Sequence, residues 1–245
     1  MGQTQTVEFS DLGVMDYKTA WDYQEALMQK NLAIKRDAVN DTTNDQRPTA
    51  NFLLFVEHPP VYTLGKSGKM ENVLIGEQER TEKGIEFYHT NRGGDITFHG
   101  PGQIVGYPIL DLEKFYTDIG RYLRELEEVV ILTLAEYGLQ AGRSKGETGV
   151  CIDTDVKGRE RKICAMGVRC SRWITMHGFA LNVNTDLSYF NHIIPCGIQN
   201  KKVTSMKEEL GREVAMQDVK EKLKRNFEKV FGVELRVKGE KEEKS

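Results

Sequence analysis

The sequence is poor in the features that mark several large classes of protein. Only four of its 245 residues are cysteines, and no two of them form a C-x-x-C pair. Zinc sites are commonly built from such closely spaced pairs, so we expect no bound metal. The chain also has no apolar run near the roughly 18 residues that a membrane-spanning helix needs. These absences argue against a zinc protein and against an integral membrane protein.

Charge of one sign is not in excess either. The 34 basic and 37 acidic residues leave a formal net charge of −3, which gives no electrostatic case for binding nucleic acid or an anionic membrane. The first residues, MGQTQTVEFSDLGV, lack the charged start and apolar core of a signal peptide. We therefore expect a cytoplasmic protein, in which cysteines stay reduced.

Nucleotide-binding motifs are missing as well. Neither G-x-x-x-x-G-K-[ST] nor G-x-G-x-x-G occurs, and Gly65-Lys66-Ser67 matches only the end of the first motif. The sequence therefore predicts no nucleotide cofactor, and nothing else in it indicates a cofactor of another kind.

Hydrophobic periodicity predicts a mixture of helices and strands. The helices are expected over residues 16–37, with Asp16 as a cap, 118–137 and 216–231. Short apolar runs predict strands at residues 51–57, 61–64, 85–89, 149–153, 162–169 and 174–183. Because the strands cluster instead of alternating with helices, we expect an α+β fold. It would be a mixed, largely antiparallel sheet flanked by helices on one side. We expect a single catalytic domain over residues 1–237 and a charged, disordered tail over 238–245.

Residues 92–107 form the most informative stretch, R-G-G-D-I-T-F-H-G-P-G-Q-I-V-G-Y. Its five glycines and one proline lie among polar side chains. Glycine lets the backbone adopt positive φ and approach a ligand closely, so one interpretation is a binding surface made largely of backbone. The other interpretation is a β-hairpin that turns at Gly100-Pro101-Gly102. The two interpretations are compatible.

Cys196 and Lys162 are the strongest candidates for covalent chemistry. Cys196 lies in P-C-G, where a turn can present its sulfur to a cleft, although an unreactive loop cysteine fits the local sequence equally well. A reactive cysteine needs a lowered pKa, because the thiolate is the attacking form. Lys162 opens the apolar run K-I-C-A-M-G-V. It either marks the exposed start of a strand or points inward, where its ammonium would hold a thiolate. His99 and His177 each precede a glycine and are candidate partners of a cysteine, with a structural role as the alternative.

Five motifs resemble those of the lipoyl(octanoyl) transferase family. They are E-H-P-P-V-Y-T-L-G-K from Glu57, R-G-G-D-I-T-F-H-G-P-G-Q-I-V-G-Y-P-I-L-D-L from Arg92, K-I-C-A-M-G-V-R from Lys162, H-G-F-A-L-N-V from His177 and I-P-C-G-I from Ile194. The likeness extends over residues 51–204, well over half of the chain. It implies an α+β fold shared with biotin and lipoate protein ligases.

The resemblance also implies a reaction in two steps. In that family a cysteine attacks the octanoyl thioester of acyl carrier protein, and a lysine amine of a lipoyl domain then takes the octanoyl group. The implied acceptors are the lipoyl domains of 2-oxoacid dehydrogenase complexes and the glycine cleavage H protein. By resemblance Cys196 is the nucleophile, and Lys162 lowers the pKa of its thiol.

The octanoyl-binding residues are likewise implied by the resemblance. They are Arg92, Gly93, Gly94, Asp95, Ile96, Thr97, Phe98, His99, Ala165, Met166, Gly167, Gly178, Phe179 and Ala180. We expect small residues such as Gly167 and Gly178 to leave room for the acyl chain, and His99 to position groups in the pocket. Backbone amides at Gly93, Gly94 or Cys196 are candidates for stabilising the tetrahedral oxyanion.

Two positions depart from the pattern of that family. Asp95 replaces a residue that is usually an amide, and Cys164, which we expect to be buried, stands where alanine is usual. The polar loop over residues 39–48 also looks longer than is typical. The main alternative function is an ATP-dependent lipoate or biotin ligase of the same fold, which would need phosphate-binding residues and Mg²⁺ but no nucleophilic cysteine. A non-catalytic protein that binds lipoyl domains is a third hypothesis.

Overall fold

The computed structural model describes residues 4–40, 48–144, 146–156, 158–194 and 202–238. Its centre is a nine-stranded sheet of order β12-β1-β2-β6-β10-β9-β8-β7, with β11 paired to β9. The strands are β1 (Gln5–Val14), β2 (Asn51–Glu57), β6 (Gln103–Ile109), β7 (Ala141–Arg143), β8 (Val150–Ile152), β9 (Arg161–Ser171), β10 (Ile174–Asn182), β11 (Lys202–Val203) and β12 (Val233–Val237). The β1–β12, β1–β2 and β9–β11 pairs are parallel and the other pairs are antiparallel, which confirms the predicted mixed, largely antiparallel sheet.

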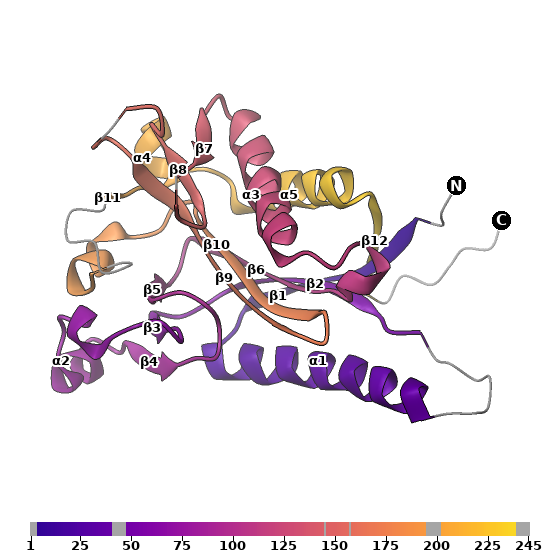
Figure 1. Ribbon diagram of the computed structural model, residues 1–245. Coiled ribbons are helices and arrows are strands. Elements are labelled where there is room, and N and C mark those ends of the chain that lie inside the picture. Colours follow the sequence, from indigo (N-terminus) through magenta and orange to yellow (C-terminus); the bar gives the residue numbers. More distant parts are fainter. Residues whose placement is uncertain (1–3, 41–47, 145, 157, 195–201, 239–245) are drawn as a thin grey trace.

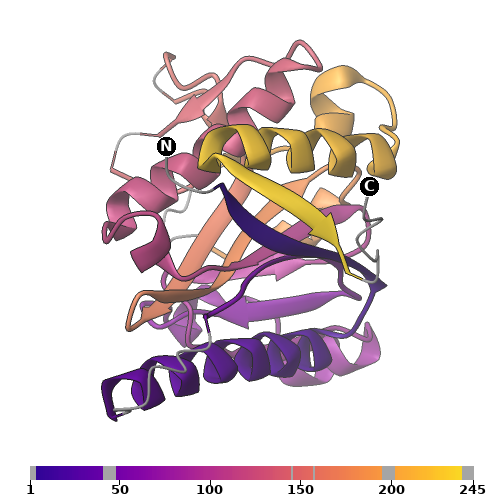
Figure 2. The same cartoon turned by 90° about the vertical axis from the view of Figure 1, so that its right-hand side faces the viewer.

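Helices cover both faces of this sheet (Figures 1 and 2). The long helix α1 (Tyr17–Asn40) lies on one face, and α3 (Ile119–Ala135) and α5 (Met216–Phe231) lie on the other. The expectation of helices on one side is therefore wrong. The central strands β2, β6 and β10 are buried along almost their whole length, as strands covered on both faces must be. Asp16 caps α1 as predicted, because its carboxylate accepts the N–H of Thr19 at 2.8 Å.

The remaining helices are short. They are α2 (Glu77–Glu82), α4 (Met206–Leu210) and three 3₁₀ turns at Met70–Asn72, Leu112–Lys114 and Leu187–His192. None of the helices in the described part of the chain is long and apolar enough to cross a membrane.

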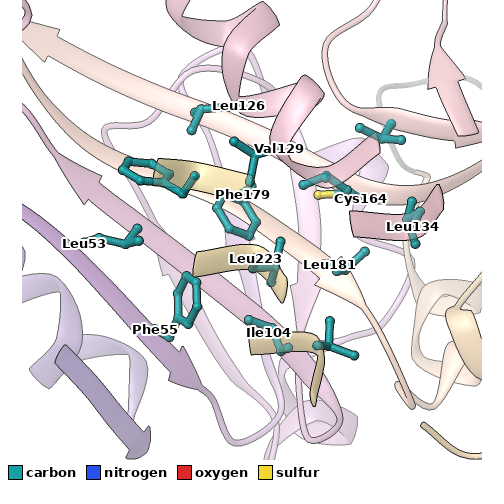
Figure 3. Packing of buried hydrophobic residues seen from close by; sticks show 14 of the residues in the cluster. Leu53, Phe55, Ile104, Leu126, Val129, Leu134, Cys164, Phe179, Leu181 and Leu223 are labelled. Carbon is teal, nitrogen blue, oxygen red and sulfur yellow. The ribbon is translucent and has the colours of Figure 1, made fainter. Parts of the chain in front are cut away.

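The larger hydrophobic core lies between the sheet and the pair α3 and α5. Figure 3 shows its members, among them Phe55 of β2, Phe179 of β10 and Leu223 of α5. Cys164 belongs to this core and is fully buried, as predicted. Burial raises the pKa of the Cys164 thiol, so this cysteine is not placed to compete for acyl groups.

A second sheet carries part of the glycine-rich stretch. In it β3 (Val61–Leu64) lies between β4 (Glu86–His89) and β5 (Ile96–His99), so the predicted strands over 51–57 and 61–64 belong to different sheets. The hairpin interpretation is also wrong, because β5 pairs with β3 while β6 pairs with β2 and β10. The turn at residues 100–102 instead carries the chain from the small sheet to the large one. This crossing places the glycine-rich loop before β5 against β9 and β10.

Candidate active site

A cavity of about 440 Å³ lies where the glycine-rich loop meets β9 and β10. Small-molecule sites typically enclose about 300–1,000 Å³. The lining of the cavity includes Lys162 and all of the predicted octanoyl-binding residues except Phe98. Phe98 packs instead into a separate hydrophobic cluster, where its ring stacks on Tyr189 with centroids 4.5 Å apart. The structure therefore brings the predicted residues of three distant motifs to one cavity and leaves Phe98 behind its wall.

The glycine-rich loop is attached to the part of β9 that β8 does not reach. The N–H of Gly93 donates to the carbonyl of Val168 at 2.9 Å. A Cβ atom on Gly167 would lie 2.6 Å from the carbonyl oxygen of Gly93, so only glycine permits this approach. The missing side chain at Gly167 thus makes room for the loop, where we had expected it to make room for an acyl chain. The amide of Gly93 is engaged in the wall and is therefore not placed to stabilise an oxyanion, whereas the expectation for Gly94 stays a prediction.

Arg92 holds the same loop from inside the protein. Its guanidinium is buried and donates to the carbonyls of Thr63, Gly93 and Asp95 at 2.6, 3.0 and 2.8 Å. A planar fork can bind three carbonyls of two backbone segments in this way, whereas a lysine ammonium cannot match its geometry. Arg92 lines the cavity, and these hydrogen bonds give it the role of fixing the shape of the wall.

Asp95 connects the loop to a second segment of the chain. One carboxylate oxygen accepts the N–H of Ile96 at 2.7 Å, and the other accepts the side-chain amide of Asn72 at 2.7 Å. The carbonyl of Asn72 in turn accepts the N–H of Ile194 at 2.9 Å. The residue that departs from the expected pattern is therefore a link between the cavity wall and residue 194.

Cys196 itself lies outside the described residues, but the chain on both sides of residues 195–201 is described. The described residues before this segment end at Ile194, and those after it begin in β11, where Val203 pairs with Lys162. The N–H of Thr204 donates to the carbonyl of Lys162 at 3.0 Å. Val203 also lines the cavity. Both flanks of the predicted nucleophile are thus tied to elements that form the cavity wall.

Lys162 points inward. Its side chain is 9% exposed, and its ammonium donates to a carboxylate oxygen of Glu147 and to the carbonyl of Thr148, both at 3.2 Å. The alternative that Lys162 marks the exposed start of a strand is therefore wrong. Glu147 also lines the cavity, and its side chain is 24% exposed. This end of the cavity consequently holds an ion pair with one partner open to solvent.

A buried carboxylate fixes the loop that carries Glu147. Glu127 of α3 is fully buried and accepts the N–H of Gly149 at 2.9 Å. It also accepts hydrogen bonds from Arg124 and Arg143 at 2.7 and 3.0 Å, which balance its charge. Gly149 has a φ of 119°, and an added Cβ would lie 2.5 Å from a carbonyl oxygen of β9. The loop is therefore held against β9 beside Lys162.

Two neutral histidines also line the cavity. Nδ1 of His99 donates to the side-chain oxygen of Gln103 at 2.8 Å, because the amide nitrogen of Gln103 is used for Asn182 at 2.9 Å. Burial holds the pKa of His99 well below its ordinary value and lowers the pKa of His177 to about 3. Both rings are uncharged near pH 7. The ring of His99 also stacks on that of Tyr17, 5.8 Å away.

Several lining residues were not among the individual octanoyl-binding candidates, although three of them lie in the stretch 92–107 that was interpreted as a binding surface. They are Tyr17, Gln103, Val105, Tyr107, Ile119, Leu123, Glu147, Thr148, Val168, His177, Asn182, Phe190 and Val203. His177 had been considered only as a partner of the cysteine. Glu147 and Thr148 carried one usable signal, since they precede Gly149 and a predicted strand, where a loop can approach a ligand.

Comparison with known proteins gives a consistent result. The family model of the lipoyl protein ligase A/B catalytic domain matches residues 16–228. The octanoyltransferase of Christiangramia forsetii is 59% identical, covering 94% of this chain and 97% of its own length. That of Flavobacterium johnsoniae is also 59% identical, covering 94% of this chain and 98% of its own.

Two solved structures share the fold. A bipartite lipoate protein ligase from Thermoplasma acidophilum has a TM-score of 0.68 at 20% identity, covering 97% of this chain and 88% of its own. A lipoate-protein ligase A bound with ATP has a TM-score of 0.66 at 17% identity, covering 98% of this chain and 90% of its own. These likenesses confirm the predicted relation of the fold to that of lipoate ligases.

Proposed function

The chain belongs to the lipoyl protein ligase A/B catalytic-domain family, as an acyltransferase of the octanoyltransferase kind, and we propose that it carries the octanoyl group on Cys196. The donor is octanoyl-acyl carrier protein, and the acceptor is a lysine amine of a lipoyl domain. The observation that carries this proposal is the position of Lys162. Its ammonium faces the cavity, and its backbone pairs with the strand that leads out of residues 195–201.

In the first step the thiolate of Cys196 attacks the thioester carbonyl. A carbon–sulfur bond to the enzyme forms, the bond to the carrier breaks, and the carrier leaves as a thiol after taking up a proton. Thioester exchange is nearly balanced, so little free energy is lost. A free cysteine thiol, with a pKa of about 8.5, is only a few per cent ionised at pH 7. The ammonium of Lys162 raises that fraction by favouring the thiolate.

The acyl chain then occupies the apolar part of the cavity. Met166 and Phe179 face each other across the β9–β10 pair, and Ala165 and Ala180 form the next pair along the strands. All four line the cavity and offer no hydrogen-bonding side chain, which suits an alkyl group. In the second step the acceptor amine attacks the acyl carbonyl, and amide formation drives the sequence forward.

The relatives' names favour transfer over ATP-dependent ligation, and one experiment separates the two. The enzyme is incubated with octanoyl-acyl carrier protein in the absence of ATP, and its intact mass is measured. We expect a gain of one octanoyl group, its loss in Cys196→Ser, and its retention in Cys170→Ser, a change at a half-buried cysteine of β9. Octanoylation of a lipoyl domain that requires ATP and free octanoate, with no acylated enzyme, would contradict the proposal in favour of a ligase.

A further inference from the structure

We propose that Glu147 binds the ammonium of the acceptor lysine as it enters the cavity for the second step. This inference rests on the proposed function and adds a residue that recognises the acceptor. The observation behind it is a carboxylate that lines the cavity, lies 3.2 Å from the Lys162 ammonium and remains 24% exposed.

Glu147 is the acidic side chain of the cavity that is placed to meet a ligand. The other acidic residue in the described lining is Asp95. Both oxygens of the Asp95 carboxylate accept hydrogen bonds from the wall, one from the N–H of Ile96 and one from Asn72. Glu147 pairs with Lys162 inside the cavity and is partly exposed, and the backbone of its loop is fixed by the fully buried Glu127. A fixed carboxylate at the exposed end of a pocket is suited to receive a cation.

The acceptor brings the charge that this site fits. A lysine amine has an ordinary pKa of about 10.4 and therefore reaches the enzyme as an ammonium. It must approach the acyl group close to the Lys162 ammonium, which repels it. Glu147 lies beside Lys162 and offsets this repulsion, because opposite charges at hydrogen-bonding distance attract strongly where water is partly excluded.

The proton balance of the second step is simple. The bound ammonium loses one proton to solvent, and the resulting amine forms a carbon–nitrogen bond with the acyl carbon. The carbon–sulfur bond to the enzyme breaks, and the second proton of the nitrogen ends on the departing sulfur. The products are an amide, a free thiol and one released proton. Glu147 holds the cation in place before the first proton leaves and forms no covalent bond.

In the first step the Glu147 carboxylate should be unfavourable, because it reduces the stabilisation of the thiolate by Lys162. An anion beside Lys162 weakens the field with which that ammonium stabilises a thiolate. Replacing Glu147 by glutamine therefore leaves Lys162 with more of its field for the sulfur. Glu147→Gln should lower the pH required for alkylation of the cysteine while it slows transfer to lysine. If Glu147 had only a structural role, its replacement would impair both the reactivity of the cysteine and the transfer to lysine.

The test compares two nucleophiles on the octanoylated enzyme. An apo-lipoyl domain supplies a cationic lysine, whereas hydroxylamine is neutral at pH 7 and gives octanohydroxamate and free enzyme. In single turnovers, Glu147→Gln should lower the ratio of the lysine rate to the hydroxylamine rate about tenfold, the size expected for one lost charge-assisted hydrogen bond. Glu147→Asp keeps the charge and should retain most of the wild-type ratio.

Glu128→Gln is the matched control. Glu128 lies outside the cavity lining and pairs with Arg143 at 2.6 Å, so its loss should leave the ratio unchanged. An unchanged ratio in Glu147→Gln, or an equal fall in Glu147→Asp, would overturn the inference about Glu147. Failure of the wild-type enzyme to form any octanoylated species would instead overturn the proposed function.

Discussion

The cavity wall changes character between Lys162 and Val168 of β9, a distance of about 20 Å at about 3.3 Å per residue. At the first end an ammonium and a carboxylate form an ion pair, and the carboxylate is partly exposed. At the second end, where Val168 pairs with His177, the His177 imidazole is buried and neutral, and the nearby Arg92 guanidinium is buried and hydrogen-bonded to backbone carbonyls. The partly exposed ion pair therefore distinguishes the Lys162 end of the cavity from the Val168 end.

This difference corresponds to the two tasks of an acyltransferase site. An alkyl chain is bound best by a wall that carries no charge and needs no water, because a buried charge would have to be compensated. Proton and acyl transfer need charged groups whose environment tunes them. A chain of hydrogen bonds connects a neutral histidine of the cavity wall to the charged end, from His99 through Gln103 to Asn182, then through Thr204 to the backbone of Lys162. The uncharged part of the wall is thus connected to the strand that carries Lys162.

Among the changes considered, the removal of Arg92 at the Val168 end should have the largest effect. Arg92→Met removes the guanidinium donor from the carbonyls of Thr63, Gly93 and Asp95, so we expect the free energy of unfolding to fall by about 4 kcal/mol. Urea denaturation measures this change. Arg92→Lys should recover only a small part of it, because one ammonium cannot replace the fork. A loss below about 1 kcal/mol would mean that water can replace the guanidinium and that this wall is not rigid.

A buried neutral imidazole behind the cavity wall, that of His58, predicts a pH dependence of stability; its ring contacts Tyr17 and His99 of the lining. Burial lowers the pKa of His58 to about 4, while the hydrogen bond from its Nδ1 to the carbonyl of Met15 acts against this shift. The unfolded chain binds a proton below about pH 6.5, whereas the folded chain does not until about pH 4. Stability should therefore fall as the pH drops from about 6.5 to about 4, by about 3 kcal/mol for this residue.

His58→Gln checks that assignment. Glutamine can still donate to Met15 and accept from Tyr107, but it does not titrate. The variant should be less stable near pH 7 and should lose less stability between about pH 6.5 and pH 4 than the wild type. Equal slopes in unfolding experiments across that range would show that the His58 imidazole is not buried in its neutral form.

At the charged end, Lys162→Ala should raise the pH needed to alkylate Cys196 by about one to two units, the effect of removing one nearby opposite charge. Iodoacetamide labelling followed by intact mass gives this profile. A second hypothesis is that Lys162 also passes the proton of the attacking amine to the sulfur. Lys162→Arg keeps the charge but is poorly suited to pass on a proton, so under this hypothesis it should alkylate normally and transfer slowly. An unchanged profile in Lys162→Ala would count against electrostatic activation, and full transfer by Lys162→Arg would exclude an essential proton relay.

The sequence predicts which residues line the cavity better than it predicts how the strands and loops pack to form it. Strong patterns were sufficient for β2 and α5, whose predicted bounds match the structure. β1 was missed because most of its residues are partly or fully exposed, which leaves little apolar pattern. The hairpin over residues 92–107 was wrong because local residues favour strands and a turn without specifying which sheet each strand joins. The contact between Glu147 and Lys162 also depends on the irregular register between β8 and β9, which no local pattern encodes.

The smallest effect is expected for a conservative change at Asp95, whose carboxylate links the cavity wall to Asn72 and through it to Ile194. Asp95→Asn restores the amide that the family resemblance leads us to expect, and it keeps an acceptor for the N–H of Ile96. Its NH₂ group would face that of Asn72 unless the Asn72 amide turns over, which it can do at small cost. We therefore expect a loss of stability below about 1 kcal/mol and nearly unchanged acylation of the enzyme.

Asp95→Ala removes both acceptors and the link to the carbonyl that holds Ile194. If that link positions the nucleophile, Asp95→Ala should slow acylation by octanoyl-acyl carrier protein more than Asp95→Asn does at equal folded fraction. Equal acylation rates for the two variants would show that the charged end does not depend on this connection.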